Sequence, residues 1–84
     1  MNYSVRIEKN AYKTLSQIKK QDRIRIIDAI DSLKEKPTAG KVLRGRWEGL
    51  RRIRVGKYRV IYSIREKELL ILVLRIGHRK DVYR

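Results

Sequence analysis

An alternating stretch over residues 50–62, LRRIRVGKYRVIY, constrains the fold more than any other part of this 84-residue chain. Side chains of a β-strand point to opposite faces in turn, so Ile53 and Val55 face one way and the intervening arginines face the other. The Gly56-Lys57 pair suits a two-residue turn of type II′, because glycine tolerates the positive φ that its first position requires. The sequence therefore predicts a tight β-hairpin here.

This hairpin sets Arg54 directly opposite Arg59 across the turn and places Arg52 on the same face. Like charges in directly opposed positions destabilise a sheet, so a small protein that keeps such a pair is expected to bind something negatively charged. The alternative is a solvated face whose charges protect the sheet from aggregation. We favour anion binding because arginine, which grips phosphate bidentately and stacks on bases, outnumbers lysine along these strands.

The rest of the chain predicts an α+β domain that spans residues 1–84. In chain order the expected elements are a strand at Tyr3 to Ile7, a helix over 10–20 with Asn10 as its cap, a helix over 22–36 capped by Asp22 and ended by Pro37, a loop over 37–49 with a short extended piece at Val42-Leu43, and strands over 50–55, 58–65 and 69–76. This order predicts two N-terminal helices packed on one side of a mostly antiparallel, four-stranded sheet.

The apolar pattern also predicts which face of the sheet the helices cover. The second helix carries an apolar stripe of Ile26, Ile27, Ile30 and Leu33. On the sheet, one face is apolar and should meet the helices: Ile53, Val55, Tyr58, Val60, Tyr62 and Ile64. The opposite face would carry Arg52, Arg54, Arg59, Ile61 and Ser63, and the last strand, LLILVLRI, is apolar on both faces, as expected near the centre of a sheet.

The charge balance limits the classes of molecule that the chain is expected to bind. The chain has 23 Lys and Arg against 9 Asp and Glu, a formal net charge of +14, and 14 of the basic residues but only 4 of the acidic ones fall in residues 41–84. A charge of this size favours nucleic acid as the partner. A peripheral membrane role is the alternative, although no amphipathic helix offers an exposed Trp or Phe to anchor it.

The residue types exclude several kinds of site and compartment. The chain lacks cysteine and has one histidine, His78, which excludes disulfide frameworks and cysteine- or histidine-based metal sites, so we expect neither metal nor cofactor. The N-terminus lacks the apolar run of a signal peptide, and the longest apolar stretch, residues 69–74, is too short to span a bilayer. We therefore expect a cytoplasmic protein with no membrane segment.

Three further side chains are candidates for a role beyond packing. His78 and Tyr83 lie in the C-terminal segment GHRKDVYR, where a histidine is either incidental or a proton carrier, and a tyrosine can stack on an unpaired base or transfer a proton. Trp47 is the one tryptophan of the chain, and we expect it to cover the edge of the core, with stacking on a base or packing against a partner as the alternatives.

Two strings, LRGRWEGLRRIRVGKYRVIY and GHRKDVYR, resemble toxins of the RelE/ParE superfamily, and the resemblance extends over essentially the whole chain. These small bacterial and archaeal proteins are encoded beside a neutralising antitoxin. The similarity is greatest to the RelE branch, whose members fold as an α+β microdomain and cleave mRNA in the ribosomal A site. It implies a cognate RelB-like antitoxin that wraps and neutralises the chain in a hetero-oligomer, and mRNA on a 70S-type ribosome as the substrate.

The resemblance also implies site residues. Toxins of the RelE type carry basic residues before the hairpin turn, an Arg after a Tyr beyond it, an Arg after the glycine that ends the last strand, a Tyr near the C-terminus and, in some relatives, a His; the matching positions are Arg52, Arg54, Arg59, Arg79, Tyr83 and His78. The best-known members carry Lys where this chain has Arg52 and Arg54. That departure matters, because arginine stays protonated and serves badly as a general base.

The chemistry that the resemblance implies is metal-independent RNA cleavage, in which the 2′-OH of the substrate attacks the adjacent phosphate. We expect Arg54 and Arg59 to clamp that phosphate, Arg79 to stabilise it or assist the leaving oxygen, and His78 or Tyr83 to move protons or stack on a base. The alternatives are a gyrase poison of the ParE type, an inactive relative that only binds its antitoxin, and a general RNA-binding module.

Overall fold

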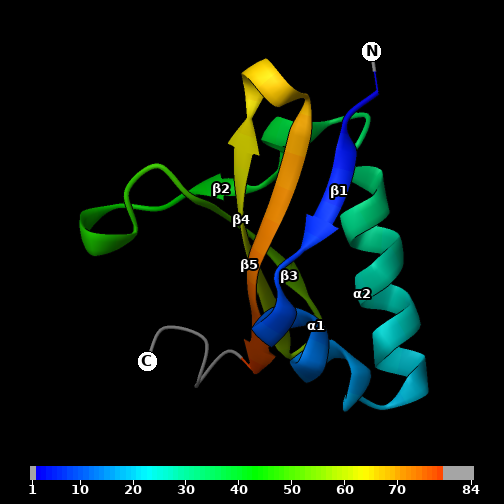
Figure 1. Cartoon of the computed structure of the whole chain (residues 1–84). Helices are drawn as coiled ribbons and strands as arrows, with labels where there is room; N and C mark the ends of the chain where they lie inside the picture. Colours follow the sequence, from blue (N-terminus) through cyan, green and yellow to red (C-terminus); the bar gives the residue numbers. More distant parts are fainter. Residues whose placement is uncertain (1, 79–84) are drawn as a thin grey trace.

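The computed structural model describes residues 2–78, which form one five-stranded sheet and two α-helices. The strands are β1 (Ser4–Ile7), β2 (Lys41–Val42), β3 (Arg51–Val55), β4 (Tyr58–Arg65) and β5 (Leu70–His78), and the helices are α1 (Lys9–Ser16) and α2 (Lys20–Ser32). The sheet has the order β1-β5-β4-β3-β2, with β1 parallel to β5 and the other neighbours antiparallel. Figure 1 shows α2 running alongside β1 and α1 near one end of the sheet. The predicted α+β class is confirmed.

The sheet has five strands rather than the four predicted. The additional strand, β2, is only two residues long and lies in the segment predicted as a loop, one residue before the expected extended piece. Lys41 pairs with Arg52 and Val42 pairs with Arg51. Two residues carry no readable alternation, so a strand of this length is fixed by its neighbours rather than by its own pattern.

The hairpin is confirmed in its register. Val55 pairs with Tyr58, Arg54 with Arg59 and Ile53 with Val60, as the alternation predicts. Gly56 has a φ of 59°, and Lys57 is not among the residues with positive φ. That combination is the signature of a type II′ turn, whose twist matches that of the flanking strands.

The helices begin and end earlier than predicted. Neither Asn10 nor Asp22 is a cap: Glu8 and Lys19 occupy the two N-cap positions, and Asp22 lies in the first turn of α2. After α2 the chain tightens into bonds of the 3₁₀ type, with the amide of Leu33 donating to the carbonyl of Ile30 at 3.0 Å. The starts differ from the predicted ones by one and two residues, and both helices end four residues earlier than predicted.

A β-bulge in β5 changes which of its side chains face the helices. Ile61 pairs with Arg75 while the next residue, Tyr62, pairs with Val73, so Leu74 is an extra residue on β5. Strict alternation would turn Arg75 toward the same face as Val73. The bulge instead places Arg75 opposite Ile61, on the face that the helices leave uncovered, and returns Ile76 to the core.

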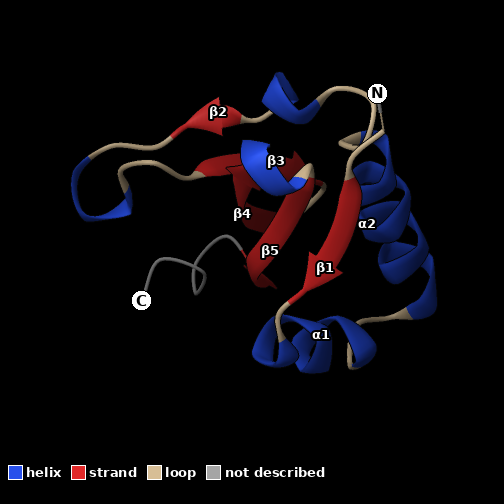
Figure 2. Cartoon of the chain, turned by 45° about the horizontal axis from the view of Figure 1, so that its top comes forward, coloured by secondary structure: helices blue, strands red, loops and turns tan. Residues whose placement is uncertain are grey.

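The core lies between the helices and one face of the sheet (Figure 2). Its buried members are Ala11, Leu15, Ile18, Ile26, Ile30, Leu33, Val60, Tyr62, Ile71, Val73 and Ile76, and the predicted sheet residues Ile53, Val55, Tyr58 and Ile64 pack against them. One member of the predicted helical stripe, Ile27, is 45% exposed and lies outside the core. Within residues 2–78, neither helix combines the length and the apolar content of a transmembrane span.

A buried tyrosine fastens the segment before β2 to the sheet. The Tyr62 hydroxyl donates to the carbonyl of Pro37 at 2.6 Å and accepts from the amide of Gly40 at 2.9 Å, and burial raises the pKa of this phenol. Arg51 donates to the carbonyl of Gly40 at 2.9 Å. A Cβ on Gly40 would lie 2.5 Å from the Tyr62 hydroxyl oxygen, so only glycine fits here. These contacts fix where the excursion over residues 43–50 leaves the sheet.

Candidate functional site

The uncovered face of the sheet carries a cluster of four arginines, Arg52, Arg54, Arg59 and Arg75, which we call the arginine face. The pairing arranges them in two neighbouring rows across the sheet. One row runs Arg52, Ile61, Arg75 and the next runs Arg54, Arg59, Gly77. Residues directly opposed in a sheet share a face, so all four guanidinium groups start from the same side.

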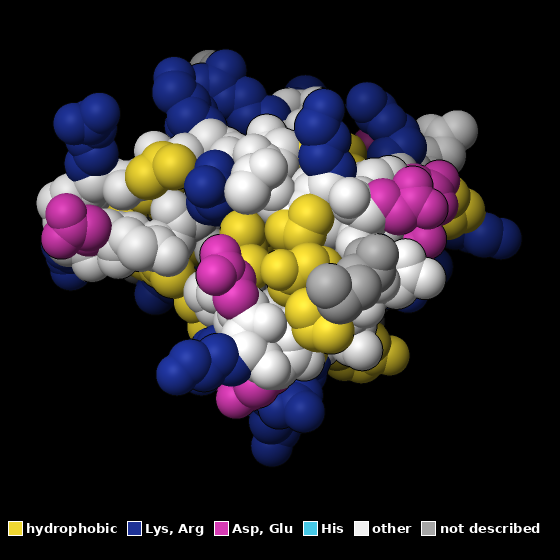
Figure 3. All heavy atoms as spheres, turned by 90° about the horizontal axis from the view of Figure 1, so that it is seen from above, with side chains coloured by type: hydrophobic (Ala, Val, Ile, Leu, Met, Phe, Trp, Pro, Cys, Tyr) yellow, Lys and Arg dark blue, Asp and Glu magenta, His cyan; other side chains and the backbone are white. Residues whose placement is uncertain are grey.

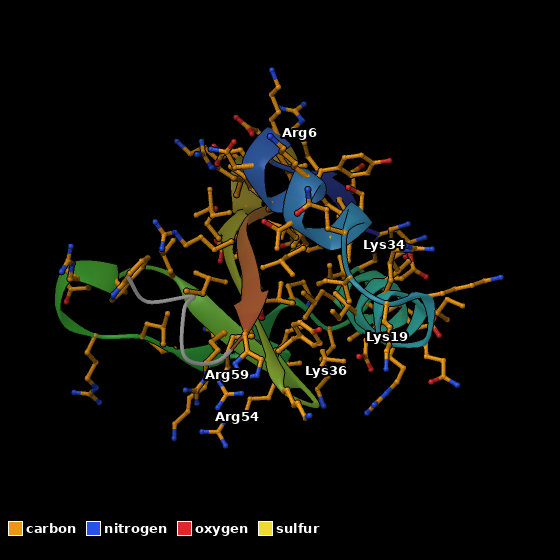
Figure 4. The ribbon with its side chains drawn as sticks, turned by 90° about the horizontal axis from the view of Figure 1, so that it is seen from below. Arg6, Lys19, Lys34, Lys36, Arg54 and Arg59 are labelled. Atoms are coloured by element: carbon orange, nitrogen blue, oxygen red, sulfur yellow. The ribbon has the colours of Figure 1, made fainter. Side chains whose placement is uncertain are left out.

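The two arginines that oppose each other differ in exposure. Arg59 is only 8% exposed and is the one charged side chain among residues 2–78 in the buried class, whereas its partner Arg54 is exposed. Figure 4 shows both projecting to the same side, away from Lys19 and Lys34. A buried guanidinium has few rotamers available, so the positive charge of Arg59 is held in place. The exposed side chain of Arg54, beside it, has more rotamers to choose from.

The charge of the arginine face is one-sided. The two rows hold no acidic residue, and Lys41 extends the first row by pairing with Arg52. The end of the molecule that Figure 3 views is different, because Asp and Glu side chains there are interspersed with Lys and Arg around an apolar patch. Charges of one sign gathered on one surface raise the local concentration of an anionic ligand. The arginine face can therefore hold phosphate groups.

Arg75 belongs to this face although alternation did not predict its place there. Its guanidinium lies over the ring of Trp47, 5.2 Å from the ring centroid, as a cation–π pair. Trp47 comes from the 3₁₀ turn Gly45–Trp47 in the excursion between β2 and β3 and is not among the residues of the helix-side core or those packed against it. The expectation that Trp47 covers the edge of that core is therefore wrong.

His78 lies at the rim of the site rather than among the arginines. It pairs with Tyr58, and the two rings meet edge to face with centroids 6.1 Å apart. Tyr58 packs against the helix-side core, so the imidazole is directed to that side of the sheet. His78 also borders two surface hollows, one toward α1 and the hairpin turn and one toward Trp47 and Arg75. The structure thus brings the hairpin arginines together but does not set His78 between them.

The other two predicted site residues, Arg79 and Tyr83, lie outside the described residues. Their roles stay predictions. Among residues 2–78, no group of three or more His, Asp or Glu side chains is arranged to hold a metal ion.

Comparison with known proteins identifies relatives over the full length of the chain. The family model described as ParE toxin of type II toxin-antitoxin system, parDE, matches residues 2–83. The chain is 31% identical over 86 residues to Toxin RelG of Mycobacterium tuberculosis. The alignment covers 100% of this chain and 99% of RelG.

Solved structures share the fold. The archaeal RelE-RelB complex from Pyrococcus horikoshii OT3 matches at a TM-score of 0.82 and 32% identity, over 98% of this chain and 100% of that one. The toxin-antitoxin complex RelBE2 from Mycobacterium tuberculosis matches at a TM-score of 0.86 and 27% identity, over 94% of this chain and 100% of that one.

Proposed function

Because this chain belongs to the ParE toxin family of type II toxin–antitoxin systems, within the RelE/ParE superfamily, we propose that it is a ribosome-dependent endoribonuclease that cleaves mRNA in the A site. The observation that carries this proposal is the arginine face, above all the nearly buried Arg59 opposite the exposed Arg54. Two opposed cations in a row that holds no acid fit an anionic ligand, which would relieve their repulsion.

The reaction needs alignment, charge neutralisation and proton transfer. The 2′-oxygen of one nucleotide forms a bond to the adjacent phosphorus, the bond from that phosphorus to the 5′-oxygen of the next nucleotide breaks, and charge builds on the phosphoryl oxygens between these events. In the proposed mechanism Arg54 and Arg59 hold those oxygens, and Arg52 adds to the field from the neighbouring row. Positioned donors of this kind stabilise charge that develops in the transition state.

The protons must move by other groups, because a guanidinium keeps its proton near neutral pH. We assign the transfers to His78 or Tyr83, and we assign Arg79 to the phosphate or the leaving oxygen, as the family resemblance implies. His78 can serve from the rim that it shares with Gly77 and Arg75 if the RNA lies along that hollow. Its contact with Tyr58 orients the imidazole from the other side.

The proposed partners follow from the same surface. The relatives from Mycobacterium tuberculosis and Pyrococcus horikoshii are complexes of toxin with antitoxin. We infer that an acidic, RelB-like antitoxin wraps this chain in a hetero-oligomer and masks the arginine face, and that the free toxin acts in the cytoplasm on ribosomes. A segment that folds on binding suits this task, since it can cover a large surface.

A second candidate function is poisoning of DNA gyrase, favoured by the match of a ParE family model to residues 2–83. That activity needs no phosphate clamp. The complete set of Arg59, Arg79 and Tyr83 in the sequence favours the nuclease instead.

The two functions are separated by inducing the chain in cells and mapping mRNA 5′ ends alongside chromosomal DNA breaks. The nuclease predicts new mRNA ends inside translated codons that disappear when initiation is blocked. The double variant Arg54→Ala/Arg59→Ala should lose these ends, whereas Arg65→Ala, which removes one exposed charge from β4, should keep them. DNA breaks with intact mRNA would establish the gyrase poison and refute the nuclease.

A further inference from the structure

Trp47 and Arg75 form a stacked pair at one border of the arginine face. The guanidinium of Arg75 lies 5.2 Å from the centroid of the indole ring, and Trp47 is only partly buried. An indole stacked against a planar guanidinium presents a broad surface that is both aromatic and cationic. Surfaces of this type attract the flat face of an unpaired nucleobase, with little dependence on which base it is.

The position of the pair relative to the hairpin arginines follows from the register. Arg75 is opposite Ile61, which is two residues beyond Arg59 on β4. With strands about 4.8 Å apart and a rise of about 3.4 Å per residue, the backbones of Arg59 and Arg75 are separated by about 8 Å. A base attached to the nucleotide beside a phosphate on Arg59 can therefore reach the pair.

A surface hollow of ≈ 570 Å³ opens beside this pair. Its walls combine apolar side chains with a few polar ones, among them Trp47, Leu50, Arg75, Asn10 and Thr14. The volume is within the usual range for small-molecule sites and has room for a base with its ribose. Glu8 also borders the hollow, and a carboxylate there disfavours a second phosphate and can accept a hydrogen bond from an exocyclic amine.

We propose that Trp47 and Arg75 are a stacking platform for the base of the nucleotide next to the phosphate held by Arg59. This inference rests on the proposed function and adds to it a substrate-positioning surface: the platform positions the RNA strand, while the hairpin arginines act on the phosphate. It also gives the excursion between β2 and β3, which Figures 1 and 2 show reaching away from both helices, a role in holding substrate.

The single tryptophan makes the test direct, because the intrinsic fluorescence excited at the red edge reports Trp47 alone. The full chain is titrated with a trinucleotide whose 2′-hydroxyls are methylated, so that it cannot be cleaved, and with the same trinucleotide lacking one base. The platform predicts quenching by the complete trinucleotide and a clearly smaller response to the abasic one at the position that stacks. Equal responses, or no quenching up to millimolar concentration, would overturn the platform.

Variants test whether the platform matters for cleavage on ribosomes. Trp47→Ala should lower the rate of codon cleavage about 5- to 150-fold, the range that loss of one stacked base produces, and Trp47→Phe should restore most of it. Arg75→Lys keeps the charge but loses the planar stack and should also slow cleavage. Its matched control is Arg6→Lys, an exposed arginine on β1, which should leave the rate unchanged. Equal rates for Arg75→Lys and Arg6→Lys would contradict the platform.

The outcomes distinguish this inference from the proposed function. Quenching without any ribosomal cleavage would refute the nuclease and leave the platform standing. Cleavage by a protein whose Trp47 does not respond to RNA would refute the platform and leave the nuclease standing.

Discussion

On one face of β4, Val60 and Tyr62 are completely buried beneath the helices, whereas on the other face Arg59 opposes Arg54 across the hairpin. The helix-side face is apolar and closed, and its one buried hydroxyl is fully bonded. On the face that the helices do not cover, two like charges oppose each other where a stable sheet would pair opposite charges. Consecutive residues of one strand thus serve different ends, since the first face belongs to the helix-side core, whereas the second buries Ile61 between Arg52 and Arg75 and gathers positive charge.

This difference has a consequence for mutagenesis. Changes on the helix-side face should lower stability and leave the chemistry of the folded molecules unchanged. Changes on the arginine face should slow the chemistry without lowering stability.

The largest loss of stability is expected from Ile71→Ala. Ile71 is 0% exposed near the start of β5, so truncation leaves a cavity and should cost about 2–5 kcal/mol. Denaturant unfolding measures the loss, and the cleavage rate per folded molecule should stay at the wild-type value. A matching fall in that rate would show that the two faces are not separable.

A smaller loss is expected from Tyr62→Phe. Removing the hydroxyl leaves the carbonyl of Pro37 and the amide of Gly40 without this partner, which should cost about 1–3 kcal/mol. Hydrogen exchange at Gly40 should rise, because the segment before β2 loses its attachment. Unchanged exchange there would mean that Tyr62 does not fasten that segment.

The same phenol predicts a difference at alkaline pH. Burial raises the pKa of Tyr62 above its usual value of 10.0. Below pH 10 the phenol keeps its proton in both the folded and the unfolded chain, so Tyr62 contributes fully to stability. Above pH 10 the unfolded chain loses this proton first, and the free energy of unfolding falls. Unfolding curves recorded on both sides of pH 10 should therefore show a shallower decline for Tyr62→Phe than for the wild type.

The smallest effect has the opposite sign. Arg54→Thr removes the like-charge opposition to Arg59 and places a strand-forming residue on β3, so stability should rise by about 0.2–1 kcal/mol. The gain should shrink with added salt, because screening weakens the repulsion. Cleavage should fall in the same variant. A stabilised variant with full activity would indicate that Arg54 belongs to a merely solvated face.

The hairpin was predictable in detail because its information is local. Alternation fixes which side chains face the core, and Gly56 fixes the turn, so the opposition of Arg54 and Arg59 followed from thirteen consecutive residues. The strand order and the parallel pairing of β1 with β5 depend on contacts far apart in the sequence. The lone β2 strand depends on Tyr62 and Arg51, which hold the segment before it.

The candidate site was predictable only in part, because an irregularity in β5 decides which of its side chains reach the site. The bulge at Leu74 reverses the face of Arg75, and alternation alone cannot reveal an extra residue in a strand that is apolar on both faces. The side of the sheet to which His78 turns follows from that same bulge and from its ring contact with Tyr58. A charged residue in an otherwise apolar strand, as Arg75 is in LLILVLRI, is the signal that could have indicated the bulge.

The central claim is that the arginine face holds the phosphate that is cleaved, and the most direct test is the single-turnover cleavage of an A-site codon on programmed ribosomes by Arg59→Ala and Arg65→Ala. Both variants remove one positive charge from the same face of β4, but Arg59 lies opposite Arg54, whereas Arg65 lies six residues farther along the strand, about 20 Å away at a rise of about 3.4 Å per residue. We expect Arg59→Ala to lose at least about 10²-fold in rate, as for other positioned donors to a developing negative charge, and Arg65→Ala to stay close to wild type, with circular dichroism showing that both are folded. Equal rates for two folded variants would contradict the account.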